Sequence, residues 1–164
     1  MFSIEHVDTS MRSDQGRVRD HNEDFVASHE PAGPDEEFRN GRLYIVADGV
    51  GGSDAGEVAS QYATERTIHH YLADHKTTDW GERLRQAMLA ANADLRLVSS
   101  EQYAGMRMAT TMVAAVLHAE RATFANVGDS RAYHWRGGFM RQVTKDQSLV
   151  ARLLEEGAIT EEEA

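Results

Sequence analysis

A short apolar run that ends in an acidic residue constrains this chain more than any other feature. Residues 43–47 read Leu-Tyr-Ile-Val-Ala without a polar break, which is typical of a buried strand. Asn40-Gly41 precedes the run as a hairpin-turn signal, and Asp48-Gly49 follows it directly. The predicted strand therefore delivers Asp48 at its C-terminal end.

A second acidic cluster lies upstream, around Glu23 and Asp24. Crowded carboxylates raise one another's pKa, and a hard divalent cation relieves this repulsion through oxygen ligands. Arg19, four residues before Glu23, adds a cation that can hold an anion beside the metal. If the segments of Asp24 and Asp48 meet in space, this combination predicts phosphate chemistry.

Each of these motifs also has a simpler interpretation. Asp-Gly is a common turn dipeptide, and acidic pairs such as Glu23-Asp24 are usually solvated surface. Glycines at 49, 51 and 52 would let the backbone approach closely, so that the carbonyl of Gly49 could join a metal shell. Asp129 is either an ordinary turn residue or a third carboxylate beside Asp24 and Asp48, and we call this group of carboxylates the acidic rim. His21 could contact phosphate or water.

Composition limits the class of protein. A length of 164 residues fits one domain, and a net charge of −10 disfavours a nucleic-acid or acidic-membrane partner. The absence of cysteine excludes a disulfide, a zinc-thiolate site and a thiol nucleophile. No apolar run approaches a membrane span, and residues 1–6 lack the pattern of a signal peptide, so we expect a cytoplasmic protein.

The order of predicted elements is strands, then helices, then strands. The predicted strands cover 3–7, 24–28, 43–47, 111–117, 122–127, 131–135 and 139–143, and the predicted helices cover about 54–72, 79–98 and 147–156. Residues 30–42 hold both prolines and are predicted as a loop, and 136–138 as a three-residue hairpin loop. This order predicts an α+β fold with helices packed on antiparallel sheet.

Taken in order, five segments resemble the metal-dependent protein serine/threonine phosphatases of the 2C type, especially their short bacterial members. The segments are 13–24 (Ser-Asp-x-Gly-x-Val-Arg-x-x-Asn-Glu-Asp), 47–52 (Ala-Asp-Gly-x-Gly-Gly), 55–60 (Ala-Gly-Glu-x-Ala-Ser), 127–133 (Val-Gly-Asp-Ser-Arg-x-Tyr) and 144–146 (Thr-Lys-Asp). The resemblance covers nearly the whole chain. The ordered set is specific, although no single piece is.

The resemblance implies a sandwich of two antiparallel β-sheets flanked by helices, with two Mn²⁺ or Mg²⁺ ions at one end. Asp48 would bridge both metals, the Gly49 carbonyl would bind the second, and Glu23 would bind the second directly or through water. Asp24 would support the cluster, and Asp129 would match a third, looser metal position.

The resemblance also implies the reaction. Arg19 would bind the phosphate of a phosphorylated protein, the product of a bacterial serine/threonine kinase, while a metal-activated water attacks phosphorus. Two positions depart from the pattern: Val50 replaces a histidine that some members carry, and Ala109 replaces the usual glycine before Thr110.

The larger departure is at the end of the chain. Family members continue with further strands and two aspartates for the first metal, so residues 1–164 resemble one domain truncated before those motifs. Exposed sheet edges, and self-association through them, are expected. Besides a phosphatase, the sequence therefore leaves open a catalytically incomplete module that binds phosphoprotein or a partner, and an α+β domain with an inert acidic rim.

Overall fold

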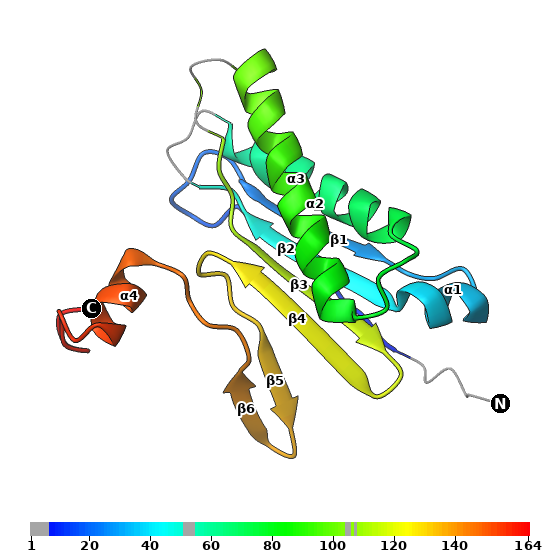
Figure 1. Ribbon diagram of the computed structural model, residues 1–164. Coiled ribbons are helices and arrows are strands. Elements are labelled where there is room, and N and C mark those ends of the chain that lie inside the picture. Colours follow the sequence, from blue (N-terminus) through cyan, green and yellow to red (C-terminus); the bar gives the residue numbers. More distant parts are fainter. Residues whose placement is uncertain (1–6, 51–54, 104–105, 107) are drawn as a thin grey trace.

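The computed structural model describes residues 7–50, 55–103, 106 and 108–164 (Figure 1). The elements in chain order are β1 (Asp24–His29), α1 (Pro34–Asn40), β2 (Arg42–Asp48), α2 (Gly56–Ala73), α3 (Trp80–Gln102), β3 (Met112–His118), β4 (Arg121–Val127), β5 (Tyr133–Arg136), β6 (Phe139–Gln142) and α4 (Leu149–Glu155). Four strands form one antiparallel sheet in the order β1-β2-β3-β4, and β5 pairs with β6 in a second antiparallel sheet. The predicted α+β class with two antiparallel sheets is confirmed.

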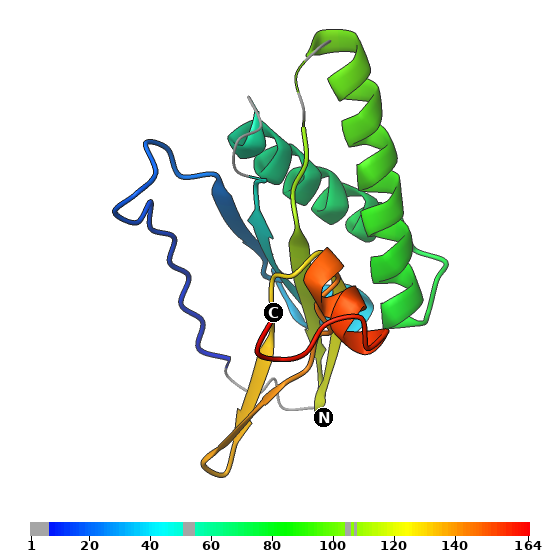
Figure 2. The same cartoon turned by 90° about the vertical axis from the view of Figure 1, so that its left-hand side faces the viewer.

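The alternating pattern of β2 explains how the large sheet is covered. Leu43, Ile45 and Ala47 are buried, whereas the residues between them are more exposed. Successive side chains of a strand point to opposite faces, so these three mark the covered face. Figure 2 shows α2 and α3 together on one side of this sheet. The strand is thus buried on one face, and Asp48 belongs to the other.

The core lies between this sheet face and the two long helices. The helix predicted over 79–98 is confirmed as α3, and Leu84, Ala87 and Leu95, at helical spacing along it, belong to the buried cluster. Asp79 caps the helix by accepting a hydrogen bond from the backbone N–H of Glu82 at 2.7 Å. None of the helices among the described residues is long and apolar enough to cross a membrane.

The prediction of a loop over 30–42 was wrong in part, because this stretch contains α1. Pro34 occupies the first turn, where its missing N–H costs no helical hydrogen bond. Three acidic residues follow in that turn, where the helix dipole favours negative charge. The two prolines marked a loop in the sequence, but one of them starts a helix.

The predicted hairpin turn at Asn40-Gly41 was also wrong. Gly41 ends α1 with φ of 61°, and its N–H donates to the carbonyl of Glu37 at 2.8 Å. A Cβ at Gly41 would lie 2.7 Å from the carbonyl oxygen of Leu117. The glycine therefore serves both the helix end and the close approach of β3.

The remaining predictions differ from the structure only in detail or lie outside it. Residues 3–6 of the predicted first strand, and Asp54 at the start of the predicted helix 54–72, lie outside the described residues, and Val7 is in no strand. The second predicted hairpin is confirmed, but Arg136 pairs with Phe139, so its loop is only Gly137-Gly138.

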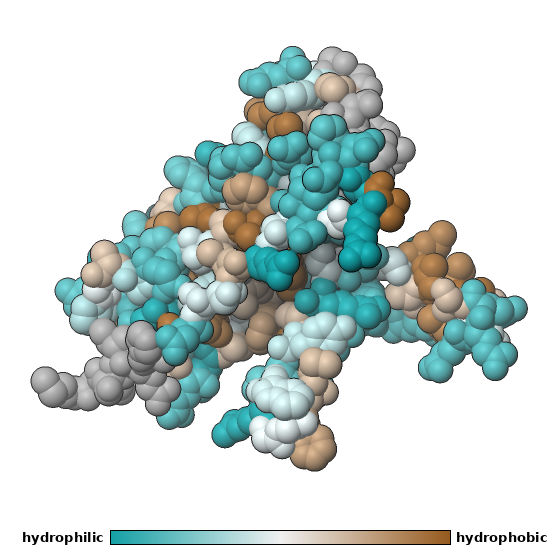
Figure 3. All heavy atoms as spheres, turned by 180° about the vertical axis from the view of Figure 1, so that it is seen from behind, coloured by the Kyte–Doolittle hydropathy of each residue, from teal (hydrophilic) through white to brown (hydrophobic). Residues whose placement is uncertain are grey.

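The C-terminal part projects from the large sheet. In Figure 1 the β5–β6 hairpin and α4 extend away from α2 and α3. Figure 3 shows apolar side chains gathered on α4, at the right of that view, where Leu149 and Val150 are exposed. Trp135 and Phe139 on the hairpin are exposed as well.

Candidate active site

The two predicted acidic segments meet at one end of the large sheet. Asp24 begins β1, Asp48 ends β2, and the two residues are direct partners in the antiparallel register. Opposed residues of neighbouring strands point to the same face, which for Asp48 is the face away from α2 and α3. The register therefore puts two carboxylates beside each other.

The electrostatics of Asp48 show which other charges reach it. Burial raises the pKa of the Asp48 carboxyl, and the charge and a hydrogen bond of Asp24 raise this pKa further. The Arg19 guanidinium lowers the pKa, and the Asp129 carboxylate raises it. Three carboxylates and one guanidinium from separate segments thus act on one another. Such a cluster is stabilised by a cation.

Gly49 is held where only a glycine fits. Its N–H donates to the carbonyl of Glu23 at 3.1 Å, which ties the end of β2 to the start of β1. A Cβ at this position would lie 2.3 Å from the carbonyl oxygen of Gly56 and 2.8 Å from that of Glu23. The start of α2 therefore packs directly on the strand end that carries Asp48.

Arg19 and Glu23 form an ion pair, with 2.6 Å between Nη1 and Oε2. The Arg19 side chain is more than half exposed, whereas that of Glu23 is largely buried. Glu23 is thus fixed beside the acidic pair, and the accessible guanidinium lies at the rim. The exposed guanidinium of Arg19 is therefore accessible beside the carboxylates.

Hydroxyl groups for which no role was predicted hold the strand ends together. Ser60 of α2 donates to the Glu23 carbonyl at 2.6 Å, and Thr110 donates to the Asp48 carbonyl at 2.9 Å. The hydroxyl of Thr111 accepts from the Asp48 N–H at 3.2 Å and lies 2.5 Å from that of Ser130. The sequence feature that could have indicated these contacts is the pair of consecutive threonines, Thr110 and Thr111, before a predicted strand.

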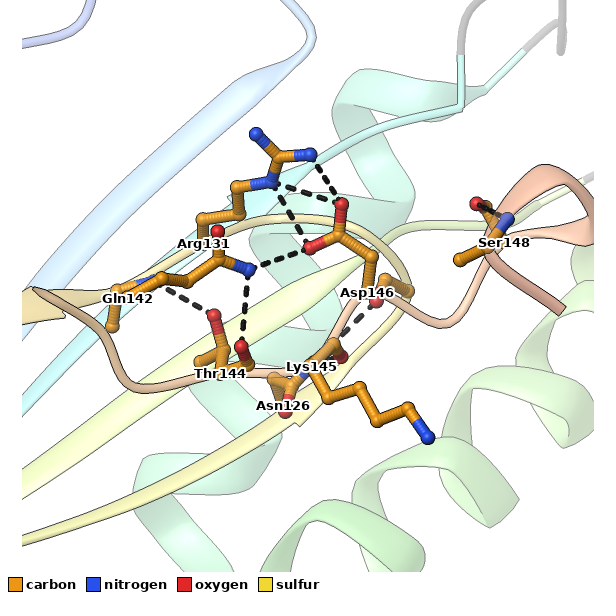
Figure 4. A network of polar contacts seen from close by, with 10 residues as sticks. Asn126, Arg131, Gln142, Thr144, Lys145, Asp146 and Ser148 are labelled. Atoms are coloured by element: carbon orange, nitrogen blue, oxygen red, sulfur yellow. Dashed lines mark hydrogen bonds and ion pairs between the residues drawn. The ribbon is translucent and has the colours of Figure 1, made fainter. Parts of the chain in front are cut away.

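The loop that carries Asp129 is fixed from both sides. Gly128 has φ of 88°, and a Cβ there would lie 2.8 Å from the Thr111 side chain. Beyond Asp129, Arg131 pairs with Asp146 through three contacts of 2.5 to 3.0 Å (Figure 4). Arg131 holds the pKa of the Asp146 carboxyl below its usual range.

Further contacts extend this network to the end of β4. The amide of Gln142 donates to Asp146 at 2.9 Å and to the carbonyl of Thr144 at 3.0 Å, and Asn126 donates to the carbonyl of Lys145 at 2.9 Å (Figure 4). The hairpin base and β4 are thereby joined. Asp129 itself stays exposed at the rim.

The described part of the structure gives no contacts that would assign a role to His21, Gly51 or Gly52. His21 is exposed in the loop before β1, and its proposed contact with phosphate or water stays a prediction. Gly51 and Gly52 lie outside the described residues.

The oxygen atoms gathered at this site are the type of ligand that a hard divalent cation prefers. Asp24, Asp48 and Asp129 offer carboxylate oxygens, Gly49 offers a carbonyl, and no thiolate is available in the chain. Within the described ranges, however, no group of three or more His, Asp or Glu side chains is arranged closely enough to hold a metal. The oxygen atoms are therefore of the kind that a divalent cation binds, but the described residues supply only part of a complete ligand set.

Comparison with known proteins identifies the arrangement. Residues 21–153 match the family model described as Protein phosphatase 2C. The serine/threonine phosphatase stp of Listeria monocytogenes is 36% identical over 159 residues, which cover 93% of this chain and 60% of that protein. The chain thus spans about three fifths of the length of this relative.

Solved structures agree with the sequence match. The crystal structure of the phosphatase Stp1 from Staphylococcus aureus superposes with a TM-score of 0.78 at 30% identity, covering 99% of this chain and 65% of that one. The catalytic domain of PstP, in complex with two manganese ions, superposes with a TM-score of 0.73 at 38% identity, covering 93% and 61%. These matches cover the large sheet, its helices and the acidic rim. The chain belongs to the protein phosphatase 2C family.

Proposed function

We propose that this chain supplies the phosphate-binding and part of the metal-binding machinery for hydrolysis of phosphoserine and phosphothreonine in proteins. The observation that carries the proposal is the registered pair Asp24–Asp48, in which burial and the neighbouring charge of Asp24 raise the pKa of Asp48. The family membership and the two manganese ions of the PstP complex support it.

Each residue has a role that follows from its position. Asp48, Asp24 and the Gly49 carbonyl would hold Mn²⁺ or Mg²⁺, with Glu23 fixed beside them by Arg19. When bound, such ions supply a water of lowered pKa that can act as the nucleophile. Arg19 would give up part of its ion pair with Glu23 and bind the equatorial oxygens of the substrate phosphate.

The substrate class and a third ion are further parts of this proposal. The substrate would be a protein phosphorylated by a bacterial serine/threonine kinase. Asp129 would serve a looser metal position, since its charge reaches Asp48 while its side chain stays accessible.

The test is Mn²⁺-dependent hydrolysis of p-nitrophenyl phosphate by this chain. Replacement of Asp48 by Asn should abolish turnover with the fold intact, because it removes one negative charge and keeps the shape. Asp35→Asn is the matched control, since Asp35 lies in the first turn of α1, at the other end of the sheet. Equal rates in the two variants would overturn the assignment of Asp48.

A second candidate function rests on the partial donor set among the described residues. The chain would then recognise phosphoprotein or a partner without turnover. A folded sample that lacks turnover, but binds a phosphoserine peptide saturably and loses this binding on Arg19→Gln, would favour this function. Loss of both activities would leave the acidic rim without a role.

A further inference from the structure

A pocket lies at the end of the large sheet opposite to Asp48. It has a volume of about 310 Å³ and is lined by residues that include Phe38, Arg39, Asn40, Trp80, Arg83 and His118. His118 ends β3 and Asn40 ends α1 just before β2 begins, whereas Asp48 stands at the far end of β2. The volume falls within the range of small-molecule sites. The pocket is therefore separate from the acidic rim.

One wall of the pocket is aromatic. The rings of Trp80 and His118 are stacked, with 4.5 Å between centroids and 26° between planes. The ring of Phe38 meets His118 edge-on at 6.1 Å, and Phe38 is 73% exposed. A flat, partly accessible aromatic surface of this kind suits a planar ring.

A buried cation forms another part of the lining. Arg83 is only 4% exposed, and its nitrogens donate to the carbonyls of Tyr71 and Arg39 and to Oδ1 of Asn40 at 2.8 to 2.9 Å. All three acceptors are neutral, and no ion pair of Arg83 occurs within the described part of the chain. A guanidinium has five N–H donors, so two N–H groups of Arg83 have no acceptor among the described residues.

Asn40 adds a second oriented donor. The residue is 8% exposed, and its Oδ1 is fixed as the acceptor from Arg83. The carboxamide nitrogen therefore points away from that bond, and it has no acceptor among the residues that the structure describes. An unpaired amide donor next to a buried guanidinium is a recognition pair for an anionic oxygen.

We propose that this pocket binds a small aromatic anion. The ring would lie against Trp80 and His118, and a carboxylate, phosphate or phosphonate on that ring would accept from Asn40 and Arg83. Arg39, at the exposed rim, would attract the anion. Asp74 is the opposing charge, because its carboxylate acts on Arg83, but it is occupied by hydrogen bonds from the N–H groups of Lys76 and Thr77.

Fluorescence of Trp80 tests the proposal directly. The chain has two tryptophans, so the variant Trp135→Phe leaves Trp80 as the only reporter. Titration with benzoate and with phenylphosphonate should change this signal saturably. Benzylamine, which has the same ring and the opposite charge, should not, and inorganic phosphate should bind more weakly than phenylphosphonate. Binding should persist in Asp48→Asn, which separates the pocket from the proposed catalytic site.

Asn40→Asp is the sharpest variant, because it keeps the acceptor for Arg83 and replaces the donor by a negative charge. It should weaken binding of both anions about tenfold or more. Asn92→Asp makes the same charge change at an exposed position of α3 and should leave the affinity unchanged. If Asn40→Asp fails to fold by circular dichroism, Arg39→Gln at the exposed rim should weaken binding about threefold. The proposal is overturned if the anions give no saturable change, if benzylamine matches benzoate, or if the folded variants bind like the parent.

Discussion

At the scale of single residues, the candidate site depends on close backbone approaches that no side chain could tolerate. Gly49 is the strongest case, since a Cβ there would fall within 2.5 Å of two backbone atoms of Gly56. The sequence marked Gly49 as a residue whose carbonyl could bind a metal. It did not show that the start of α2 packs on the same residue, because this contact joins segments that only the tertiary fold brings together.

Gly49→Ala should lower the free energy of unfolding by about 1–3 kcal/mol, because the added methyl group meets rigid backbone. Urea denaturation checks this value. Gly33→Ala is the matched control: its backbone is extended with φ of −176°, nothing lies within 4 Å of an added Cβ, and the change from glycine to alanine at this N-cap of α1 should cost only about 0.5 kcal/mol. Equal losses for the two variants would contradict the close contact.

At the scale of elements, a polar cluster joins α2 to α3. Asp94 of α3 accepts from Arg66 at 2.6 Å and lies 2.7 Å from the ring of His70, both on α2. All three side chains are about one-third exposed or less. His70 and Arg66 hold the pKa of the Asp94 carboxyl below its ordinary value of 3.8. The cluster fixes how the two helices cross above the sheet.

Asp94→Asn should destabilise the chain by about 1 kcal/mol at neutral pH, because it removes the charge that both partners contact. A carboxyl whose folded pKa is lowered stabilises the fold above its unfolded pKa. It loses that effect as the pH falls through the folded pKa. The difference between parent and variant in urea denaturation should therefore shrink as the pH is lowered below about 3.8. A difference that stays constant with pH would contradict the ion-pair account.

Elements with strong local signals were predictable from sequence, and those fixed by tertiary contacts were not. The helix predicted over 79–98 is confirmed as α3, whose apolar residues Leu84, Ala87 and Leu95 are buried. The helix α1 was missed because the two prolines and the charges of residues 30–42 suggest a loop in isolation. Asp24 and Asp48 were identified, but their direct pairing in the β1–β2 register needed the structure.

At the scale of the whole molecule, much apolar surface stays exposed. Val46 on the open face of the sheet is 44% exposed, and Trp135 and Met140, which pair across the hairpin, are 66% and 65% exposed. In the described part of the chain, β1 and β4 have no strand partner on their outer sides. Edges and apolar patches of this kind favour association, which the sequence also predicts.

We expect reversible self-association at high protein concentration. Added salt should strengthen it, because the net charge of −10 makes the copies repel each other. Met140→Lys should reduce it, whereas Met11→Lys, at a site 53% exposed in the N-terminal segment, should have little effect. Sedimentation velocity measures the distribution. A monomer at all concentrations and salt levels would contradict this expectation.

The most direct test of the central claim is a calorimetric titration of this chain with Mn²⁺, beside Asp48→Asn and the distant control Asp35→Asn. The account predicts saturable binding to the parent and the control, and affinity weakened about tenfold or more in Asp48→Asn, because that variant removes one carboxylate of the registered pair. Equal Mn²⁺ binding by all three proteins, or none by the folded parent, would contradict the assignment of the acidic rim as a metal site.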